Sequence, residues 1–148
     1  MLYHLYVADE IDAQQICDTL WPNQIPVKYF DEPQHLSLLS IFRKIPKLPN
    51  LNSSDFLNDY HEYFELLYPS EAGAECHVVR FPDDLVRALA DISDDAISDL
   101  AVKWFAIEPS FAKREWTKQD IMELLKKVCN ACQTATTRHK SVLCRFSL

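Results

Sequence analysis

The chain has 148 residues, of which 48% are apolar and 11% aromatic, and its formal net charge is −7. This length predicts one globular domain over residues 1–148 with a core of its own. The sequence contains a single glycine, Gly73. It therefore lacks glycine-rich phosphate loops, dinucleotide-binding fingerprints and the G-x-S-x-G nucleophile elbow, which excludes the common nucleotide-binding and hydrolase signatures.

Apolar runs are short throughout the chain. No run reaches the ~18 residues that a membrane-spanning helix needs. The first residues, 1–7, meet acids at Asp9 and Glu10 and lack the basic start and long apolar stretch of a secretory signal. Five cysteines, an odd number, in a chain large enough to fold without disulfides favour reduced thiols. We therefore expect a cytoplasmic protein that does not enter a membrane.

The first half of the sequence predicts one strand, three helices and an extended segment. The strand covers 2–7, a helix capped by Asp9 runs from about 10 to 20, and an extended segment covers 25–30. A second helix begins near Pro33, and a third begins after Ser53 or Ser54 and ends at Pro69. Apolar spacing predicts the inner faces of these helices as Ile11, Ile16 and Leu20; Leu38, Ile41 and Phe42; and Phe56, Leu57, Tyr60, Phe64 and Leu67.

The second half predicts two strands, over 76–81 and 142–148, with three helices between them. The first helix opens at Pro82, the second is capped by Ser93, and the third begins at a capping box formed by Thr117 and Asp120. The inner face of the third helix has the clearest period: Ile121, Leu124, Leu125, Val128, Cys132 and Ala135. The fold class is therefore α+β: a single helix-rich domain with a small sheet formed by short N-terminal, central and C-terminal strands.

Charge is distributed unevenly along the chain. Residues 55–108 hold thirteen acids and three bases, a net charge of −10, whereas residues 109–148 hold three acids and eight bases, a net charge of +5. A block of this negative charge repels nucleic acid and anionic membranes and attracts basic partners. A solvated surface that aids solubility is the alternative explanation of the same block.

Two groups of acids within this block are the candidate partner-binding residues. Those of the third helix are Asp55, Asp59 and Glu62, and those around the helix capped by Ser93 are Asp91, Asp94, Asp95 and Asp99. Acids one helical turn apart repel each other, which suggests a use other than local stability, although capping also explains Asp94 and Asp95. Trp116, close to Arg114 and Lys113, is the tryptophan expected to be exposed and is the remaining candidate.

A rival interpretation is a small enzyme or metal-binding protein that uses Cys76, His77, Cys129 and Cys132. The Cys129 and Cys132 pair has the spacing of a zinc half-site but falls inside a helical pattern, where core packing is the simpler explanation. Cys76 and His77 are neighbours in a predicted strand, so their side chains face opposite sides and cannot form a dyad. We expect neither a cofactor nor a metal, and no catalytic residue can be assigned.

One stretch of the second half resembles small uncharacterised bacterial proteins of the immunity-protein type, which are encoded beside polymorphic toxins. The resemblance covers residues 79–148 and is carried by Val79-Arg80-Phe81-Pro82-Asp83-Asp84-Leu85-Val86, Ala88-Leu89-Ala90, Leu100-Ala101-Val102-Lys103-Trp104, Trp116 and the segment 142–148. It implies a non-catalytic protein that neutralises a basic toxin, such as a nuclease, through an acidic surface. The expected partner is thus a basic protein, not nucleic acid or a membrane, and the sequence leaves the oligomeric state open.

Overall fold

The computed structural model describes residues 2–18, 25–26, 64–69, 75–113 and 115–147. Five strands lie within these ranges: β1 (Leu2–Ala8), β2 (Ile25–Pro26), β3 (Glu65–Tyr68), β4 (Cys76–Arg80) and β5 (Ser141–Ser147). The helices there are the 3₁₀ turn η1 (Glu10–Asp12), α1 (Ala13–Asp18), α4 (Asp83–Ala90), α5 (Asp94–Ile107), α6 (Pro109–Lys113) and α7 (Lys118–Arg138). The fold is α+β, as the sequence predicted.

The strands form one sheet in the order β2-β1-β5-β4-β3, and every neighbouring pair is antiparallel. The N-terminal strand β1 and the central strand β4 both pair with the C-terminal strand β5. In this register Leu5 and Val79 both lie opposite Cys144. The two ends of the chain therefore meet in the middle of the sheet, and strands far apart in the sequence depend on one another for their hydrogen bonds.

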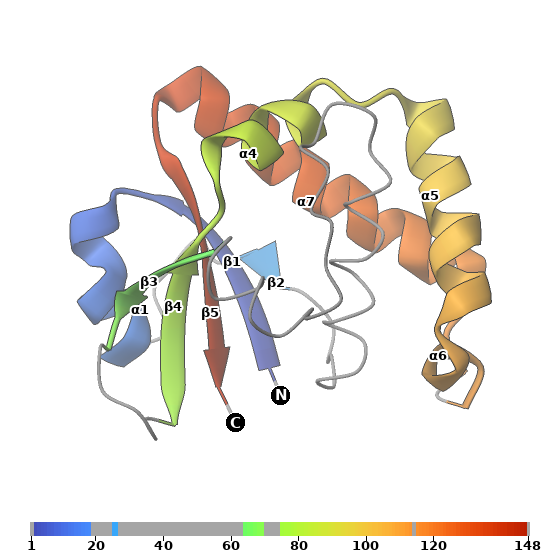
Figure 1. Cartoon of the computed structure of the whole chain (residues 1–148), viewed down its shortest axis with the longest axis horizontal. Helices are drawn as coiled ribbons and strands as arrows, with labels where there is room; N and C mark the ends of the chain where they lie inside the picture. Colours follow the sequence, from blue (N-terminus) through green and yellow to red (C-terminus); the bar gives the residue numbers. More distant parts are fainter. Residues whose placement is uncertain (1, 19–24, 27–63, 70–74, 114, 148) are drawn as a thin grey trace, which may run out of the picture.

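Helices cover both faces of the sheet (Figure 1). On one face α7 packs against β1 and β5 and supports α4 and α5; on the other, α1 packs against β3, β4 and β5. β5 contributes to both layers, because Val142 and Cys144 belong to the core beneath α7 while Leu143 belongs to the smaller core beneath α1. This two-sided burial explains why the end of the sequence reads as a nearly continuous apolar run.

The predicted helix starts in the second half are confirmed. Ser93 Oγ accepts a hydrogen bond from the Ala96 N–H at 3.3 Å at the start of α5. The predicted capping box opens α7, whose buried residues include every one predicted for its inner face: Ile121, Leu124, Leu125, Val128, Cys132 and Ala135. Capping residues and a sustained helical period agree at these positions, so the sequence pattern alone was sufficient to predict where the helices begin and which face of α7 is buried.

The end of the third predicted helix is wrong, because residues 65–68 form strand β3 instead. Glu65 lies opposite Arg80 of β4, and its carboxylate binds the Arg80 guanidinium at 2.9 Å. Pairing with β4 satisfies the backbone of this segment, so a tertiary contact overrides the helical spacing of its apolar residues. The rest of that predicted helix and the whole second helix lie outside the described residues.

Two smaller corrections concern the first helix and α6. Ile11, expected on an inner face, is 89% exposed, whereas Ile16 is buried as predicted, together with Ala13 and Cys17. The reason for the exposure of Ile11 is that η1 turns every three residues, so the spacing of an α-helix does not apply across it. Leu20, the third residue predicted for this face, lies outside the described residues. The short helix α6 was not predicted, since five residues are too few for a periodic pattern.

Candidate functional site

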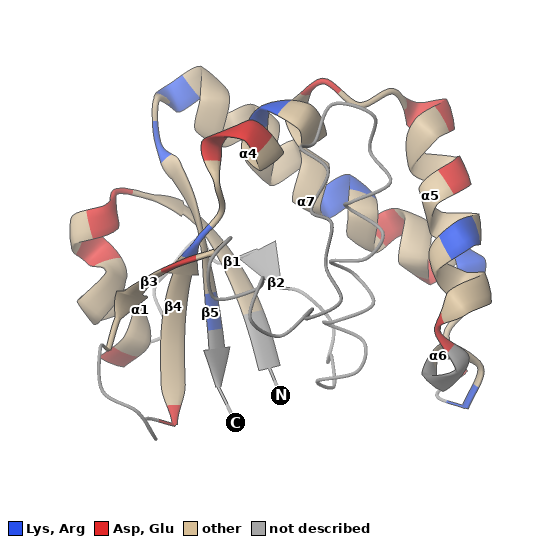
Figure 2. Cartoon of the chain, viewed as in Figure 1, with Lys and Arg blue, Asp and Glu red and all other residues tan. Residues whose placement is uncertain are grey.

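Four of the predicted partner-binding acids lie around α5. Asp94, Asp95 and Asp99 are exposed residues of its first half, and Asp91 is exposed at the end of α4, which directly precedes it. Figure 2 shows acidic positions along α5, at the edge of the molecule opposite α1. The other three candidates, Asp55, Asp59 and Glu62, lie outside the described residues.

The geometry of α5 divides these acids between faces. Its inner side is buried through Ile97, Leu100, Ala101 and Trp104. At 100° per residue, Asp95 and Asp99 fall on the opposite, outward side. Asp94 points to the flank nearer α7, where its charge contributes to raising the pKa of Cys129. We call Asp91, Asp95 and Asp99 the acidic edge. Unlike Asp94, they are not among the charges that raise the pKa of Cys129 on α7.

No described residue forms an ion pair or a side-chain hydrogen bond with the carboxylates of the acidic edge. Four acids elsewhere are paired with a cation: Arg80 binds Glu65 at 2.9 Å, Asp83 at 3.2 Å and Glu10 at 3.3 Å. Lys140 binds Asp9 in the same region. Among the described residues, the carboxylates of the acidic edge are therefore exposed and have no cationic partner, whereas these four acids form ion pairs within the fold.

Helix electrostatics explain only part of this arrangement. Asp94 and Asp95 occupy the first turn of α5, where the helix dipole favours negative charge. Asp91 stands instead at the C-terminal cap of α4, where the dipole disfavours a carboxylate. Asp99 repels Asp95 across one turn, at a cost of a few tenths of a kcal/mol. Local stability thus accounts for Asp94 and Asp95 but not for Asp91 or Asp99.

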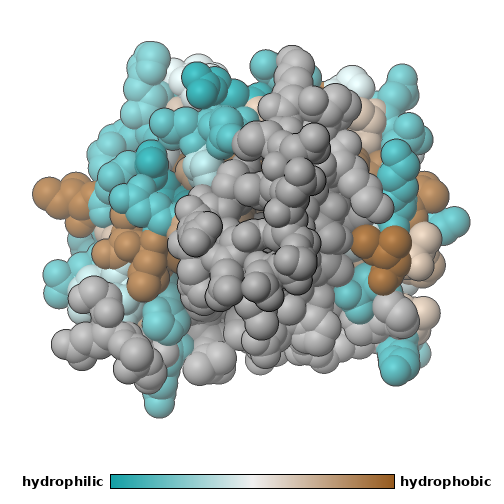
Figure 3. All heavy atoms as spheres, in the orientation of Figure 1, coloured by the Kyte–Doolittle hydropathy of each residue, from teal (hydrophilic) through white to brown (hydrophobic). Residues whose placement is uncertain are grey.

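Exposed apolar side chains lie on the same helix and were missed in the sequence. Val102 is 48% exposed and follows Asp99 by one turn on the outward side, and Ile107 is also exposed near the end of α5. In Figure 3 the described hydrophobic atoms form separate small groups, one of them toward the side where α5 lies. The sequence could have revealed Val102 as exposed, because this apolar residue falls outside the stripe of buried residues on α5.

Trp116 is half-buried, not exposed as expected. Its ring lies 5.3 Å from that of Phe111, which in turn contacts Trp104 edge-on at 5.1 Å. Its backbone N–H donates to the carbonyl of Phe111 at 3.0 Å. Trp116 therefore covers the end of the main core, and only its remaining exposed part is open to a partner.

The cysteine and histidine candidates are not assembled into a site. Cys129 and Cys132 are buried in the core side of α7, and burial raises the pKa of Cys129 to about 12 and that of Cys132 further. Cys76 packs on the α1 side of the sheet, and the alternation of β4 places His77 on the other side. No three His, Cys, Asp or Glu side chains within the described ranges are grouped to hold a metal ion.

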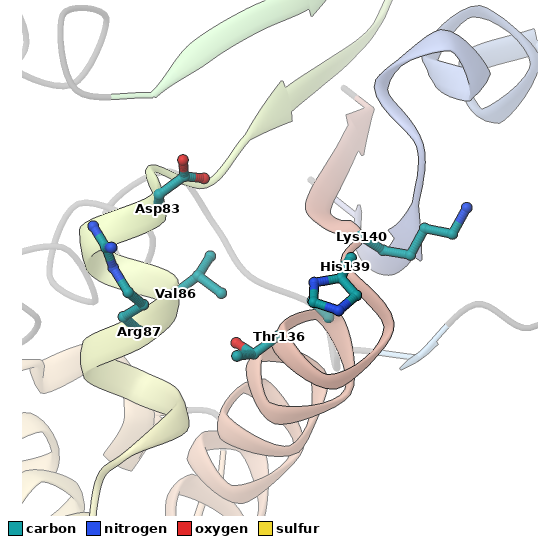
Figure 4. Close-up of a pocket in the computed structure, with 7 residues that line it drawn as sticks. Asp83, Val86, Arg87, Thr136, His139 and Lys140 are labelled. Carbon is teal, nitrogen blue, oxygen red and sulfur yellow. The ribbon is translucent and has the colours of Figure 1, made fainter.

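A shallow pocket of about 230 Å³ lies between the start of α4 and the end of α7 (Figure 4). Val86 and Thr136 face each other across it, and His139 stands at its rim. Three of its lining residues are Asp, Arg or Lys: Asp83 is paired with Arg80, Lys140 is paired with Asp9, and the third is Arg87. Small-molecule sites are usually 300–1,000 Å³ and enclosed, so the acidic edge remains the better candidate.

None of the helices in the described segments is both long and apolar enough to cross a membrane. Comparisons with protein families, curated proteins and solved structures give no match to this chain.

Proposed function

We propose that this chain is a non-catalytic protein-binding domain of the immunity-protein type, a cytoplasmic bacterial protein that neutralises a basic toxin such as a nuclease. The observation that carries the proposal is the acidic edge: exposed carboxylates at Asp91, Asp95 and Asp99 with no cationic partner among the described residues. Asp91 and Asp99 oppose local helix stability, which supports a role in binding.

The acidic edge would act as a substitute for a nucleic-acid backbone. A nuclease binds phosphates through lysine and arginine side chains, and carboxylates spaced along a helix offer the same charge. Occupation of that basic site would exclude the nucleic acid. Attraction between opposite charges would also accelerate the encounter, since electrostatic complementarity acts mainly on the association rate.

The exposed apolar residues of α5 give this surface a second kind of contact. Protein interfaces commonly have an apolar centre surrounded by polar residues. Val102, beside Asp99 on the outward side of α5, supplies an apolar contact next to the charged ones. The resemblance over residues 79–148 is compatible with this proposal, because that segment contains the last two residues of β4 and the whole of α4, α5, α6, α7 and β5, and so includes the acidic edge.

Neutralisation of a toxin tests the proposal directly. The gene neighbouring that of this chain is expressed as a candidate basic toxin in a susceptible host, with the wild-type chain or a variant. The wild-type chain should restore growth, and the Asp95→Lys/Asp99→Lys variant should restore it less. A matched control, Asp18→Lys/Glu75→Lys, makes the same change in net charge at exposed acids of α1 and of the turn before β4. Equal protection by both variants would argue against the acidic edge.

A further inference from the structure

Two cysteines from distant parts of the sequence meet on the α1 side of the sheet. Cys17 lies in the last turn of α1 and Cys76 is the first residue of β4. Their Sγ atoms are 2.6 Å apart, with the Cys17 thiol donating to Cys76. The Cys76 thiol also lies 3.6 Å from the Cys17 carbonyl. The covalent S–S distance is roughly 2.05 Å, so only a small approach separates this contact from a bond.

The surroundings hold both residues in place. Cys17 is 8% exposed and belongs to the same core as Val78, with Leu67 and Tyr68 packed against it. The Arg145 guanidinium of β5 donates two N–H groups to the Cys17 carbonyl, each at 3.4 Å. This anchors the end of α1 to the sheet beside Cys76. The two sulfurs are thus kept together by helix packing and by a side chain of a third element.

The remaining cysteines do not share this arrangement. Cys129 and Cys132 lie three residues apart on α7, where Cβ atoms are about 5–6 Å apart, beyond the 3.5–4.5 Å that a disulfide requires. Cys144 is buried on the other face of the sheet, beneath α7. The five cysteines are free thiols in this structure, and geometry prepares one pair of them for oxidation.

We propose that Cys17 and Cys76 form a reversible disulfide that fastens α1 to β4 when the protein meets a small-molecule disulfide. The half-buried Cys76 is the more accessible sulfur and reacts first. Its sulfur attacks one sulfur of the oxidant, the oxidant's S–S bond breaks, and one small thiol leaves with the Cys76 proton. Cys17 Sγ then attacks Cys76 Sγ, and the second small thiol leaves with the Cys17 proton. The two thiols of the protein lose two electrons and two protons, and the oxidant gains both.

This order agrees with the environment of Cys17. Burial, the hydrogen bond with Cys76 and the charge of Cys76 raise the pKa of Cys17 to about 12, which keeps it a thiol until its neighbour has reacted. The disulfide would close a loop between positions 59 residues apart in sequence. Closing so long a loop reduces the conformational entropy of the unfolded chain and therefore stabilises the folded state.

The experiment treats the native full-length chain with oxidised glutathione, blocks free thiols by alkylation, and maps the peptides by mass spectrometry. We expect a Cys17–Cys76 linked peptide that has lost two hydrogens, with Cys129, Cys132 and Cys144 alkylated only after denaturation. In Cys17→Ser, glutathione should remain attached to Cys76, because the resolving sulfur is gone. Unlinked Cys17 and Cys76, or a mixture of all cysteine pairings, would overturn the proposal.

Thermal unfolding provides a second readout, made first on the wild-type chain and then on two variants. The oxidised chain should unfold about 10 °C above the same sample after reduction. Cys129→Ala, which leaves the pair intact, should keep this difference, and Cys76→Ala should abolish it. An unfolding temperature unaffected by reductant in the wild-type chain would contradict the proposal. These outcomes are independent of toxin binding.

Discussion

Thr117 and Asp120 cap the start of α7 reciprocally. The Thr117 N–H donates to Asp120 Oδ2 at 2.9 Å, and the Asp120 N–H donates to Thr117 Oγ1 at 3.1 Å. This pair satisfies backbone donors that a helix start otherwise leaves without partners. Because α7 supports both the sheet and α5, the capping box helps to position the acidic edge.

Replacement of Thr117 by alanine should destabilise the protein by about 1 kcal/mol, the usual cost of losing a capping side chain. Thr117→Ser keeps the hydroxyl and should remain within a few tenths of a kcal/mol of the wild type. Urea unfolding monitored by circular dichroism measures both. Equal stability of the alanine and serine variants would show that the cap contributes nothing.

Truncation of Leu125 should be far more costly. Leu125 is 1% exposed in the core under α7, so Leu125→Ala removes buried contacts and leaves a cavity, at about 2–5 kcal/mol. Val102→Ala, on the outward side of α5, is the control and should change stability by less than about 0.5 kcal/mol. Similar unfolding midpoints for the two variants would mean that this face of α7 is not core.

The end of α7 offers a stabilising substitution. His139 has φ 54°, in the left-handed region, and the next residue, Lys140, donates its N–H to the Ala135 carbonyl at 2.9 Å. Glycine adopts this conformation without the steric penalty of a Cβ. His139→Gly should therefore stabilise the chain by up to about 1 kcal/mol, whereas Lys127→Gly inside α7 should cost about 1 kcal/mol. Two losses of similar size in the same unfolding assay would contradict this expectation.

His4 should make stability depend on pH. The residue is 7% exposed, and its buried Nδ1 has no hydrogen-bond partner among the described residues. Burial and the charge of Arg145 lower the pKa of His4 below 6.5. The unfolded state therefore binds the proton more readily. The contribution of His4 to the free energy of unfolding is therefore complete above pH 6.5. It is lost as the pH falls from 6.5 through the lowered pKa of the folded state.

Unfolding free energies measured between pH 7.5 and 5 should fall for the wild type. They should fall less steeply for His4→Gln, which keeps a polar side chain but does not titrate in this range. Parallel curves for the two proteins would show that His4 does not cause the dependence.

The features predicted correctly from sequence are those set by neighbouring residues. The capping box at Thr117 and the period through Leu125 depend on contacts within one helix, so spacing alone reveals them. Glu65 was wrongly predicted to lie in a helix. Its strand forms by pairing with Arg80 of β4, a contact that the local sequence does not show. The Cys17–Cys76 contact joins residues of different elements, and no local pattern relates them.

The candidate surface was predictable only in part. The sequence marked Asp95 and Asp99 as one turn apart, and the fold places both on the outward side of α5. The sequence could not distinguish Asp94 from these two acids, because the position of Asp94 on the flank near α7 depends on how the helices pack. Trp116 looked exposed beside basic residues, yet its ring packs on Phe111 because α6, too short to be predicted, folds back beneath it.

The association rate with a purified basic partner tests the central claim most directly. Stopped-flow measurements would compare the wild-type chain with Asp95→Lys/Asp99→Lys and with the control Asp18→Lys/Glu75→Lys, at low and high salt. The acidic-edge variant should associate about tenfold more slowly than the wild type at low salt, with the difference shrinking near 1 M salt, where the screening length is about 3 Å. The control should stay close to the wild type. Association that is equally fast for all three proteins, and independent of salt, would contradict docking through the acidic edge.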